Sequence, residues 1–184
     1  MSGTVSSSID FDKHGKQSGY LQAGDSTNNS GWATFNLPIY SVNSGSGPKV
    51  LIIGGNHGDE YEGQFAIANL IRNLKDTDVA GELIAIPSIS YPASYASTRL
   101  WPDGSNFNRI FPGNENGLIP EKIAHYVATE LIPRVDVVMD IHSGGRGFQW
   151  LEGATMTWSD DKKYRSDLIK NLNAWNTRYS MIFP

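Results

Sequence analysis

Two apolar runs that each lead into a histidine motif constrain the fold of this chain more than any other feature. Residues 50–53 (VLII) precede residues 54–60 (GGNHGDE), and residues 135–140 (VDVVMD) precede residues 141–144 (IHSG). Short apolar runs of this kind are typical of strands buried on both faces of a parallel sheet. Because the carboxyl ends of parallel strands share one edge of the sheet, we expect His57 and His142 to lie together there.

Strand and helix patterns alternate along the chain. Residues 31–42 alternate apolar and polar in places, which indicates a strand or a pair of strands, and the apolar spacing over residues 64–75 indicates a helix. Further strands are expected at residues 49–54, 82–87, 148–151, 154–158 and 177–183, and further helices at residues 120–132 and after a cap at Ser159. This alternation predicts an α/β fold with a mostly parallel mixed sheet flanked by helices.

Two long segments depart from this pattern. Residues 1–48 are rich in Ser, Gly and Asn, and we expect them to form a β-rich segment packed on a catalytic domain that spans residues 49–184. Residues 88–118 contain no long periodic run but many Pro, Gly, Ser and Asn residues. Because so long a loop inside a compact domain is usually functional or disordered, its charged and amide residues favour a functional role.

Composition excludes several kinds of site. The 184 residues include no cysteine, so any metal must be held by His, Asp or Glu. The formal net charge is −4 and no run of Lys or Arg occurs, which argues against a nucleic-acid partner. Residues 1–8 lack the basic and apolar regions of a signal peptide, and we find no membrane span. We therefore expect no membrane partner and a cytoplasmic location.

The two histidine motifs supply the ligands of a metal ion. His57 and Glu60 stand three residues apart in a glycine-rich turn, and His142 follows the second apolar run. Two imidazoles and one carboxylate are typical protein ligands of a catalytic zinc ion, whose fourth position is open for water. We therefore predict one zinc ion per chain at His57, Glu60 and His142. The same ligands also take other divalent ions, so the metal's identity is less constrained than its presence.

Three side chains of the long loop suit a small anionic substrate. Arg109 offers paired donors and Asn108 adds an amide, so together they could bind a substrate carboxylate. Arg99 lies in the same loop, and a cation near the zinc ion would stabilise the oxyanion that forms when an acyl carbonyl is attacked. The sequence therefore predicts zinc-assisted hydrolysis of a small anionic amide.

Each of these features also has a purely structural interpretation. The glycine-rich turn could be a plain strand-to-helix turn or a phosphate-binding loop, although the GK[ST] sequence typical of the latter is absent. His142 alone could be a core histidine, and Arg109 alone could form a surface salt bridge. Their occurrence together, at strand ends and in the long loop, favours function. We interpret His14 and His125 as structural or solvated.

Three segments resemble the succinylglutamate desuccinylase/aspartoacylase family: residues 55–60 (GNHGDE), 106–113 (NFNRIFPG) and 140–144 (DIHSG). The resemblance extends from about residue 10 to residue 158. Within the family, the closest similarity is to a branch that hydrolyses N-acetylated diaminobutyrate, and it rests on residues 10–12 (DFD), 19–21 (GYL), 31–32 (GW), 39–40 (IY) and 61–63 (YEG). It implies a zinc carboxypeptidase-like fold with His57, Glu60 and His142 as zinc ligands. It also implies that Asn108 and Arg109 bind the substrate carboxylate and that Arg99 polarises the carbonyl.

The chain departs from the family pattern in two ways. Asn106 stands where related enzymes often have an acidic residue, which would make the first zinc histidine more basic than an amide does. The family's general-base glutamate comes well after the third zinc ligand, so we expect it beyond Pro184. Glu62 and Glu152 match no family motif and receive no such role. We therefore expect the N-terminal part of a longer enzyme, with a fold truncated at the C-terminus and poor turnover.

The resulting hypothesis is a zinc-dependent deacylase whose partner is a small N-acyl amino acid, such as an N-acetyl-diaminobutyrate-like compound. One alternative is a metallocarboxypeptidase that uses the same ligands on peptide C-termini. Another is a non-catalytic metal-binding domain, which the missing base and the amide at Asn106 would support. An unfinished sheet would also expose a strand edge, so a homo-oligomer is a further expectation that the sequence leaves open.

Overall fold

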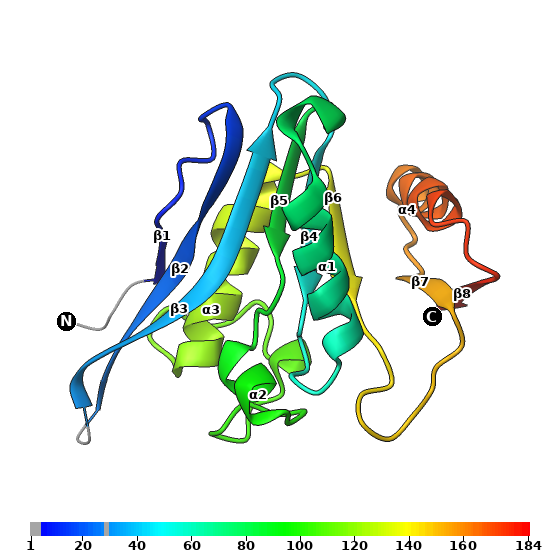
Figure 1. Cartoon of the computed structure of the whole chain (residues 1–184). Helices are drawn as coiled ribbons and strands as arrows, with labels where there is room; N and C mark the ends of the chain where they lie inside the picture. Colours follow the sequence, from blue (N-terminus) through cyan, green and yellow to red (C-terminus); the bar gives the residue numbers. More distant parts are fainter. Residues whose placement is uncertain (1–4, 28–29) are drawn as a thin grey trace. The chain divides into compact units, whose positions relative to one another are not determined.

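A six-stranded mixed sheet organises most of the chain. The computed structural model describes residues 5–27 and 30–184, which divide between two units, Met1–Gly147 and Phe148–Pro184 (Figure 1). The sheet belongs to the first unit. Its strands are, in order across the sheet, β1 (Val5–Ser7), β2 (Gly15–Thr27), β3 (Ser30–Asn43), β5 (Glu82–Ile86), β4 (Lys49–Gly54) and β6 (Val137–Ile141).

The sheet has a parallel part and an antiparallel part. Strands β5, β4 and β6 run parallel, whereas β1, β2, β3 and β5 pair antiparallel. The predicted α/β class and mixed sheet are confirmed. The antiparallel part is larger than we predicted. Strand β2 was not predicted because it contains no long apolar run. Along its polar sequence, Leu21 and Ala23 are the residues that reach the core.

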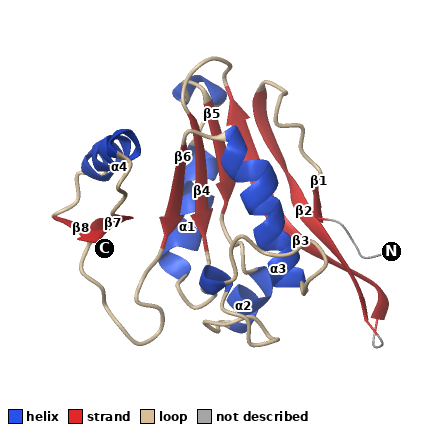
Figure 2. Cartoon of the chain, turned by 180° about the vertical axis from the view of Figure 1, so that it is seen from behind, coloured by secondary structure: helices blue, strands red, loops and turns tan. Residues whose placement is uncertain are grey.

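Helices cover both faces of this sheet (Figure 2). On one face, α1 (Tyr61–Asn73) buries Ile67 and Ile71 against the sheet. On the other face lies α3 (Ile119–Tyr126), which continues as a π-helical turn (Val127–Leu131) and a 3-10 turn (Ile132–Arg134). The predicted helices over residues 64–75 and 120–132 are therefore confirmed, with shifted ends. The sheet is thus the middle of three layers.

The long segment between β5 and α3 is ordered by aromatic packing. It contains the short helix α2 (Tyr91–Ala96) and the 3-10 turn η2 (Phe107–Arg109), while a second 3-10 turn, η1 (Asp76–Asp78), precedes β5. The sequence did not predict α2, because six residues are too few to show helical periodicity. Trp101 and Phe107 are buried and stack with ring centroids 6.3 Å apart, which ties this segment to the core.

The second unit is a small β-α-β arrangement. Strands β7 (Gly153–Thr157) and β8 (Tyr179–Phe183) are parallel, and α4 (Lys162–Ala174) connects them. The strand predicted over residues 148–151 is wrong: these residues lie in no strand, and the apolar ones among them are exposed. The predicted cap at Ser159 is also wrong, because the Asp161 carboxylate accepts the N–H groups of Lys163 and Tyr164 and so caps α4.

The structure bears only partly on two further expectations, the domain division and the N-terminal segment. The proposed division into residues 1–48 and 49–184 stays a prediction, although β3 and β5, one from each segment, are neighbours in the same sheet. The expectation about a leader sequence concerns residues 1–8, of which residues 1–4 lie outside the described residues. Every helix within the described ranges is too short or too polar to cross a lipid bilayer.

Candidate metal centre

The turn after β4 carries His57 and Glu60 into the interior. Strand β4 ends at Gly54, and Glu60 occupies the N-cap position of α1. His57 is 2% exposed and Glu60 is 4% exposed. Gly58 lies against α2 so closely that a Cβ atom there would sit 2.1 Å from the Ala93 carbonyl carbon. Glycine at this position is therefore required by a close approach of two backbones.

Hydrogen bonds from the segment after β5 hold this turn in place. The N–H groups of Ile89 and Ser90 donate to the carbonyl oxygens of Gly54 and Gly55. The Ser90 hydroxyl donates to the Asn56 carbonyl oxygen at 2.8 Å and accepts the Trp101 indole N–H at 2.8 Å. The buried Trp101 thereby anchors the turn that carries His57.

His142 reaches the same place from β6. It follows the last residue of that strand, Ile141, which pairs with Gly54 of β4. The first turn of α1 crosses close by, because a Cβ atom on Gly63 would lie 2.8 Å from the Ile141 carbonyl oxygen. As predicted, the ends of two parallel strands bring the histidines together, with ring centroids 5.1 Å apart.

Glu60 lies between the two imidazoles. Its Oε1 is 2.8 Å from His57 Nδ1, and its Oε2 is 2.7 Å from His142 Nδ1. The Ser143 backbone N–H also donates to Oε2, at 3.1 Å. One ligand atom from each of His57, Glu60 and His142 lies within 4.8 Å of the others, which is close enough to hold one metal ion.

The outer nitrogens of both imidazoles face hydrogen-bond acceptors. His57 Nε2 is 3.2 Å from Asn106 Oδ1, and His142 Nε2 is 2.9 Å from Asp140 Oδ2. A neutral imidazole that donates through Nε2 carries a lone pair on Nδ1. Both Nδ1 atoms would then point lone pairs at a carboxylate, an arrangement that needs a cation between them. The donor set therefore fits a divalent metal ion such as zinc.

Hydrogen bonds within the site shift the pKa of both Glu60 and His142. Hydrogen bonds to Asp140 and Glu60 raise the pKa of His142 to about 10. Burial acts to raise the pKa of the Glu60 carboxyl, but hydrogen bonds from His142, His57 and the Ser143 N–H outweigh it and hold that pKa well below its usual range. The site thus holds a carboxylate that attracts positive charge from two sides.

The predicted loop residues lie at different distances from the cluster that His57, Glu60 and His142 form. Arg99 Nη1 is 2.9 Å from Glu60 Oε1, so its guanidinium lies at the edge of the cluster. Asn108 and Arg109 connect to it indirectly: the Asn108 N–H donates to Asn106 Oδ1 at 3.2 Å, and the exposed Arg109 donates to the Asn108 carbonyl oxygen at 3.1 Å. The structure thus brings His57, Glu60, His142 and Arg99 together, and η2 lies beside them.

Three residues that surround the three candidate ligands were missed by sequence reasoning. Asp140 contacts the outer nitrogen of His142, the Asn56 amide donates to Asp140, and the Ser143 backbone N–H donates to Glu60. Asp140 could have been found, because residues two apart on a strand point to the same side. Asn56 and Ser143 left no such signal, since their partners are far apart in the sequence.

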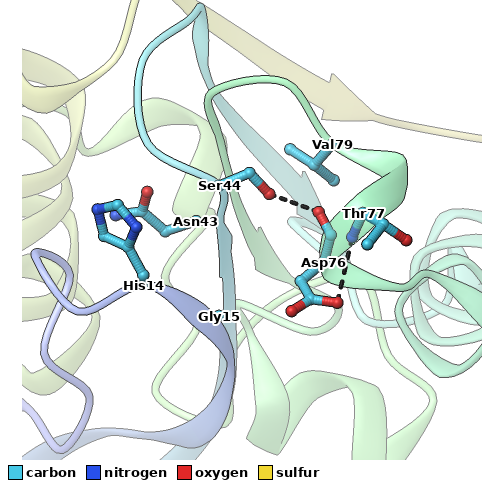
Figure 3. Close-up of a pocket in the computed structure, with 7 residues that line it drawn as sticks. All are labelled: His14, Gly15, Asn43, Ser44, Asp76, Thr77 and Val79. Carbon is cyan, nitrogen blue, oxygen red and sulfur yellow. Dashed lines mark hydrogen bonds between the residues drawn. The ribbon is translucent and has the colours of Figure 1, made fainter.

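A cleft elsewhere in the first unit is separate from this cluster. Its volume is about 410 Å³, and its lining includes His14, Asn43, Asp76, Thr77 and Val79 (Figure 3). Asn43 pairs with Glu82, the first residue of β5, so the cleft lies at the end of the sheet opposite to His57. The other remaining histidine, His125, lies on α3.

Known proteins resemble this chain in both sequence and structure. Residues 46–184 match the succinylglutamate desuccinylase/aspartoacylase catalytic domain. The N-alpha-acetyl-L-2,4-diaminobutyric acid deacetylase of Halomonas elongata is 38% identical over 179 residues, which are 97% of this chain and 52% of that protein.

Solved structures also share its fold, and two of them illustrate the similarity. The succinylglutamate desuccinylase/aspartoacylase from Rhodobacter sphaeroides has a TM-score of 0.92 at 38% identity, over 97% of this chain and 55% of that one. The product-bound ectoine utilization protein EutE (DoeB) from Ruegeria pomeroyi has a TM-score of 0.94 at 35% identity, over 100% of this chain and 56% of that one. The present chain therefore spans about half the length of these relatives.

Proposed function

The chain belongs to the succinylglutamate desuccinylase/aspartoacylase family, as its sequence predicted, and on this basis we propose that it carries the metal centre of a zinc-dependent deacylase. The proposed reaction is hydrolysis of the amide of a small N-acyl amino acid. The observation that carries the proposal is the convergence of His57, Glu60 and His142 on one point. The name of the Halomonas elongata relative supports an N-acetylated diaminobutyrate as the substrate.

The proposed zinc ligands are the Nδ1 atoms of His57 and His142 and the carboxylate of Glu60. A zinc ion in such a site supplies Lewis acidity, which polarises an acyl carbonyl and makes water more acidic. The chain's own contribution is orientation. Asn106 and Asp140 accept the outer imidazole N–H groups, so both Nδ1 atoms face Glu60.

Arg99 is the proposed stabiliser of negative charge on the carbonyl oxygen. Its guanidinium contacts Glu60, and its side chain is 51% exposed, so it can reach a substrate that enters from solvent. A cation placed where negative charge develops lowers the barrier to attack on the carbonyl. Its present partner, the Glu60 carboxylate, keeps it at the edge of the cluster.

Asn108 and Arg109 are the proposed carboxylate-binding residues. Both belong to η2, whose N-cap residue Asn106 contacts His57, so a carboxylate held there would lie beside the metal ligands. One Arg109 nitrogen donates to its neighbour's carbonyl oxygen. The planar fork of N–H groups in a guanidinium matches the two oxygens of a carboxylate.

Metal analysis of the purified chain tests the proposal directly. We expect one equivalent of zinc in the parent protein and a substoichiometric amount in His57→Ala, because loss of one imidazole leaves only two ligands. His125→Ala is a matched control, since that histidine lies on α3. Parent protein that takes up no divalent metal would overturn the proposal.

Substrate comparison separates the proposed deacylase from its rivals. The zinc-loaded chain is offered N-acetyl-L-2,4-diaminobutyrate and, separately, a short peptide with a free C-terminus, and released acetate and amino acid are measured. Release or tight binding of the acetylated amino acid, weakened in Arg109→Ala with zinc content unchanged, supports the deacylase. Preference for the peptide would favour a metallocarboxypeptidase, and zinc uptake with neither ligand bound would favour a metal-binding domain.

A further inference from the structure

We propose that Asn56 and Asp140 form a bridge that positions His142 and ties the two ligand-bearing segments together. This inference rests on the proposed metal centre, because the bridge acts through a metal ligand. Neither residue contacts the cluster's centre itself. Asp140 touches the outer nitrogen of His142, and Asn56 touches Asp140.

The bridge converges on a single oxygen atom. Asp140 Oδ2 is 2.9 Å from His142 Nε2 and 2.8 Å from Asn56 Nδ2, which donates to it. Asp140 lies one residue before the end of β6 and His142 directly follows the strand, so the short Ile141 step lets the two side chains meet. A carboxylate oxygen that accepts both N–H groups fixes the rotation of the imidazole about its own axis and selects the tautomer with Nδ1 free to bind metal.

Asn56 is itself held rigidly. It is 4% exposed, and its backbone carbonyl oxygen accepts the Ser90 hydroxyl, which in turn accepts the Trp101 indole N–H. Asn56 also directly precedes His57. The bridge therefore joins the backbone that carries one histidine ligand to the side chain that orients the other.

The two histidines differ in how much they need such support. The His57 side chain is 2% exposed and is confined by its surroundings, whereas the His142 side chain is 35% exposed. The partner behind His57 is the neutral amide of Asn106, and the partner behind His142 is a carboxylate. A carboxylate raises the basicity of an imidazole more than an amide does. The charged partner, Asp140, therefore contacts His142, which is the less buried of the two histidines.

The test measures metal affinity and cobalt spectra in addition to activity. Asp140→Asn removes the charge but keeps the shape, and Asn56→Ala removes the second arm while leaving Asp140 in place. Asp136→Asn is the matched control: it neutralises a carboxylate just before the same strand, where Asp136 accepts the Lys49 N–H at the other end. Zinc affinity is measured by competition with a chelator, and the visible absorption of the cobalt-substituted protein reports ligand geometry.

We expect Asp140→Asn to weaken zinc binding by about 10- to 100-fold and to change the cobalt spectrum, since removal of such partners typically has this effect. Asn56→Ala should change both in the same direction by less, and Asp136→Asn should match the parent. Parent-like affinity and spectrum in Asp140→Asn would overturn the inference while leaving the metal centre intact. Unfolding of the metal-free Asp140→Asn protein would overturn it too, because Asp140 would then be a folding residue. A parent that binds neither zinc nor cobalt would instead overturn the proposed function.

Discussion

The two ends of the large sheet carry similar residue types and use them differently. At the carboxyl ends of β4 and β6, His57 and His142 direct their Nδ1 atoms at the Glu60 carboxylate. At the opposite end, the exposed His14 lines an open cleft, and the amide of Asn43 is engaged by the Phe11 carbonyl oxygen and the Gly45 N–H.

The difference shows that convergence of side chains, and not residue type alone, makes a cluster that could hold a metal ion. At the carboxyl end, the N-terminus of α1 and the ends of two strands meet. Three possible metal-ligand atoms therefore lie close together there. At the other end, polar side chains satisfy nearby backbone groups, which leaves no common focus among the groups that line the cleft. Substitutions at each end of the sheet and zinc titration test this difference.

The largest effect is expected from Glu60→Gln, which keeps the shape but removes the charge that both imidazoles face. The variant should lose more zinc affinity than the roughly 10- to 100-fold that loss of a partner behind a ligand costs. Isothermal titration or chelator competition measures this. Stoichiometric zinc of parent affinity in Glu60→Gln would show that the centre lies elsewhere.

Zinc should also stabilise the parent fold. At free zinc of 100 times the dissociation constant, the free energy of unfolding should rise by about 2.7 kcal/mol, because the ion binds the folded state preferentially. Denaturant unfolding with zinc and with a chelator gives the difference. The same comparison on Glu60→Gln should show no change, and an equal gain there would mean that zinc binds outside the cluster.

Gly58→Ala tests the close packing of α2 against the turn that carries His57. A Cβ atom there would meet the Ala93 carbonyl carbon at 2.1 Å, so the backbone must shift. We expect a loss of about 1–3 kcal/mol in the free energy of unfolding, as for other overpacked sites, with weaker zinc binding. Gly147→Ala is the control: a Cβ atom there meets nothing within 4 Å, and its cost should stay within about 0.5 kcal/mol. Equal costs for both substitutions would refute the close-packing argument.

The smallest effect is expected from His14→Ala at the opposite end of the sheet. Its side chain is exposed and lines the cleft without joining the cluster. Zinc stoichiometry should be unchanged, and the free energy of unfolding should stay within about 0.5 kcal/mol of the parent. A drop in bound zinc would place a second metal site at this end.

Several elements were predicted correctly because their signals are local. The apolar run of β4 and the helical spacing in α1 each follow from burial of one segment against a sheet. Strand β2 was missed because two side chains, Leu21 and Ala23, carry its contribution to the core. The strand predicted over residues 148–151 failed for the opposite reason, since apolar residues there are exposed in the described structure.

The candidate ligands, two histidines and a glutamate that follow apolar runs, could be identified from the amino-acid sequence, as could the arginine and amide side chains in the loop between them. The hydrogen-bond partner of each outer imidazole nitrogen, by contrast, is visible only in the folded chain. The bond between His57 and Asn106 spans 49 residues of chain, and the bond between Asn56 and Asp140 spans 84. Hydrogen bonds tolerate errors of only a few tenths of an ångström. Long-range packing, here around Trp101 and the parallel pairing of β4 with β6, sets positions to that accuracy, whereas periodicity in the sequence does not.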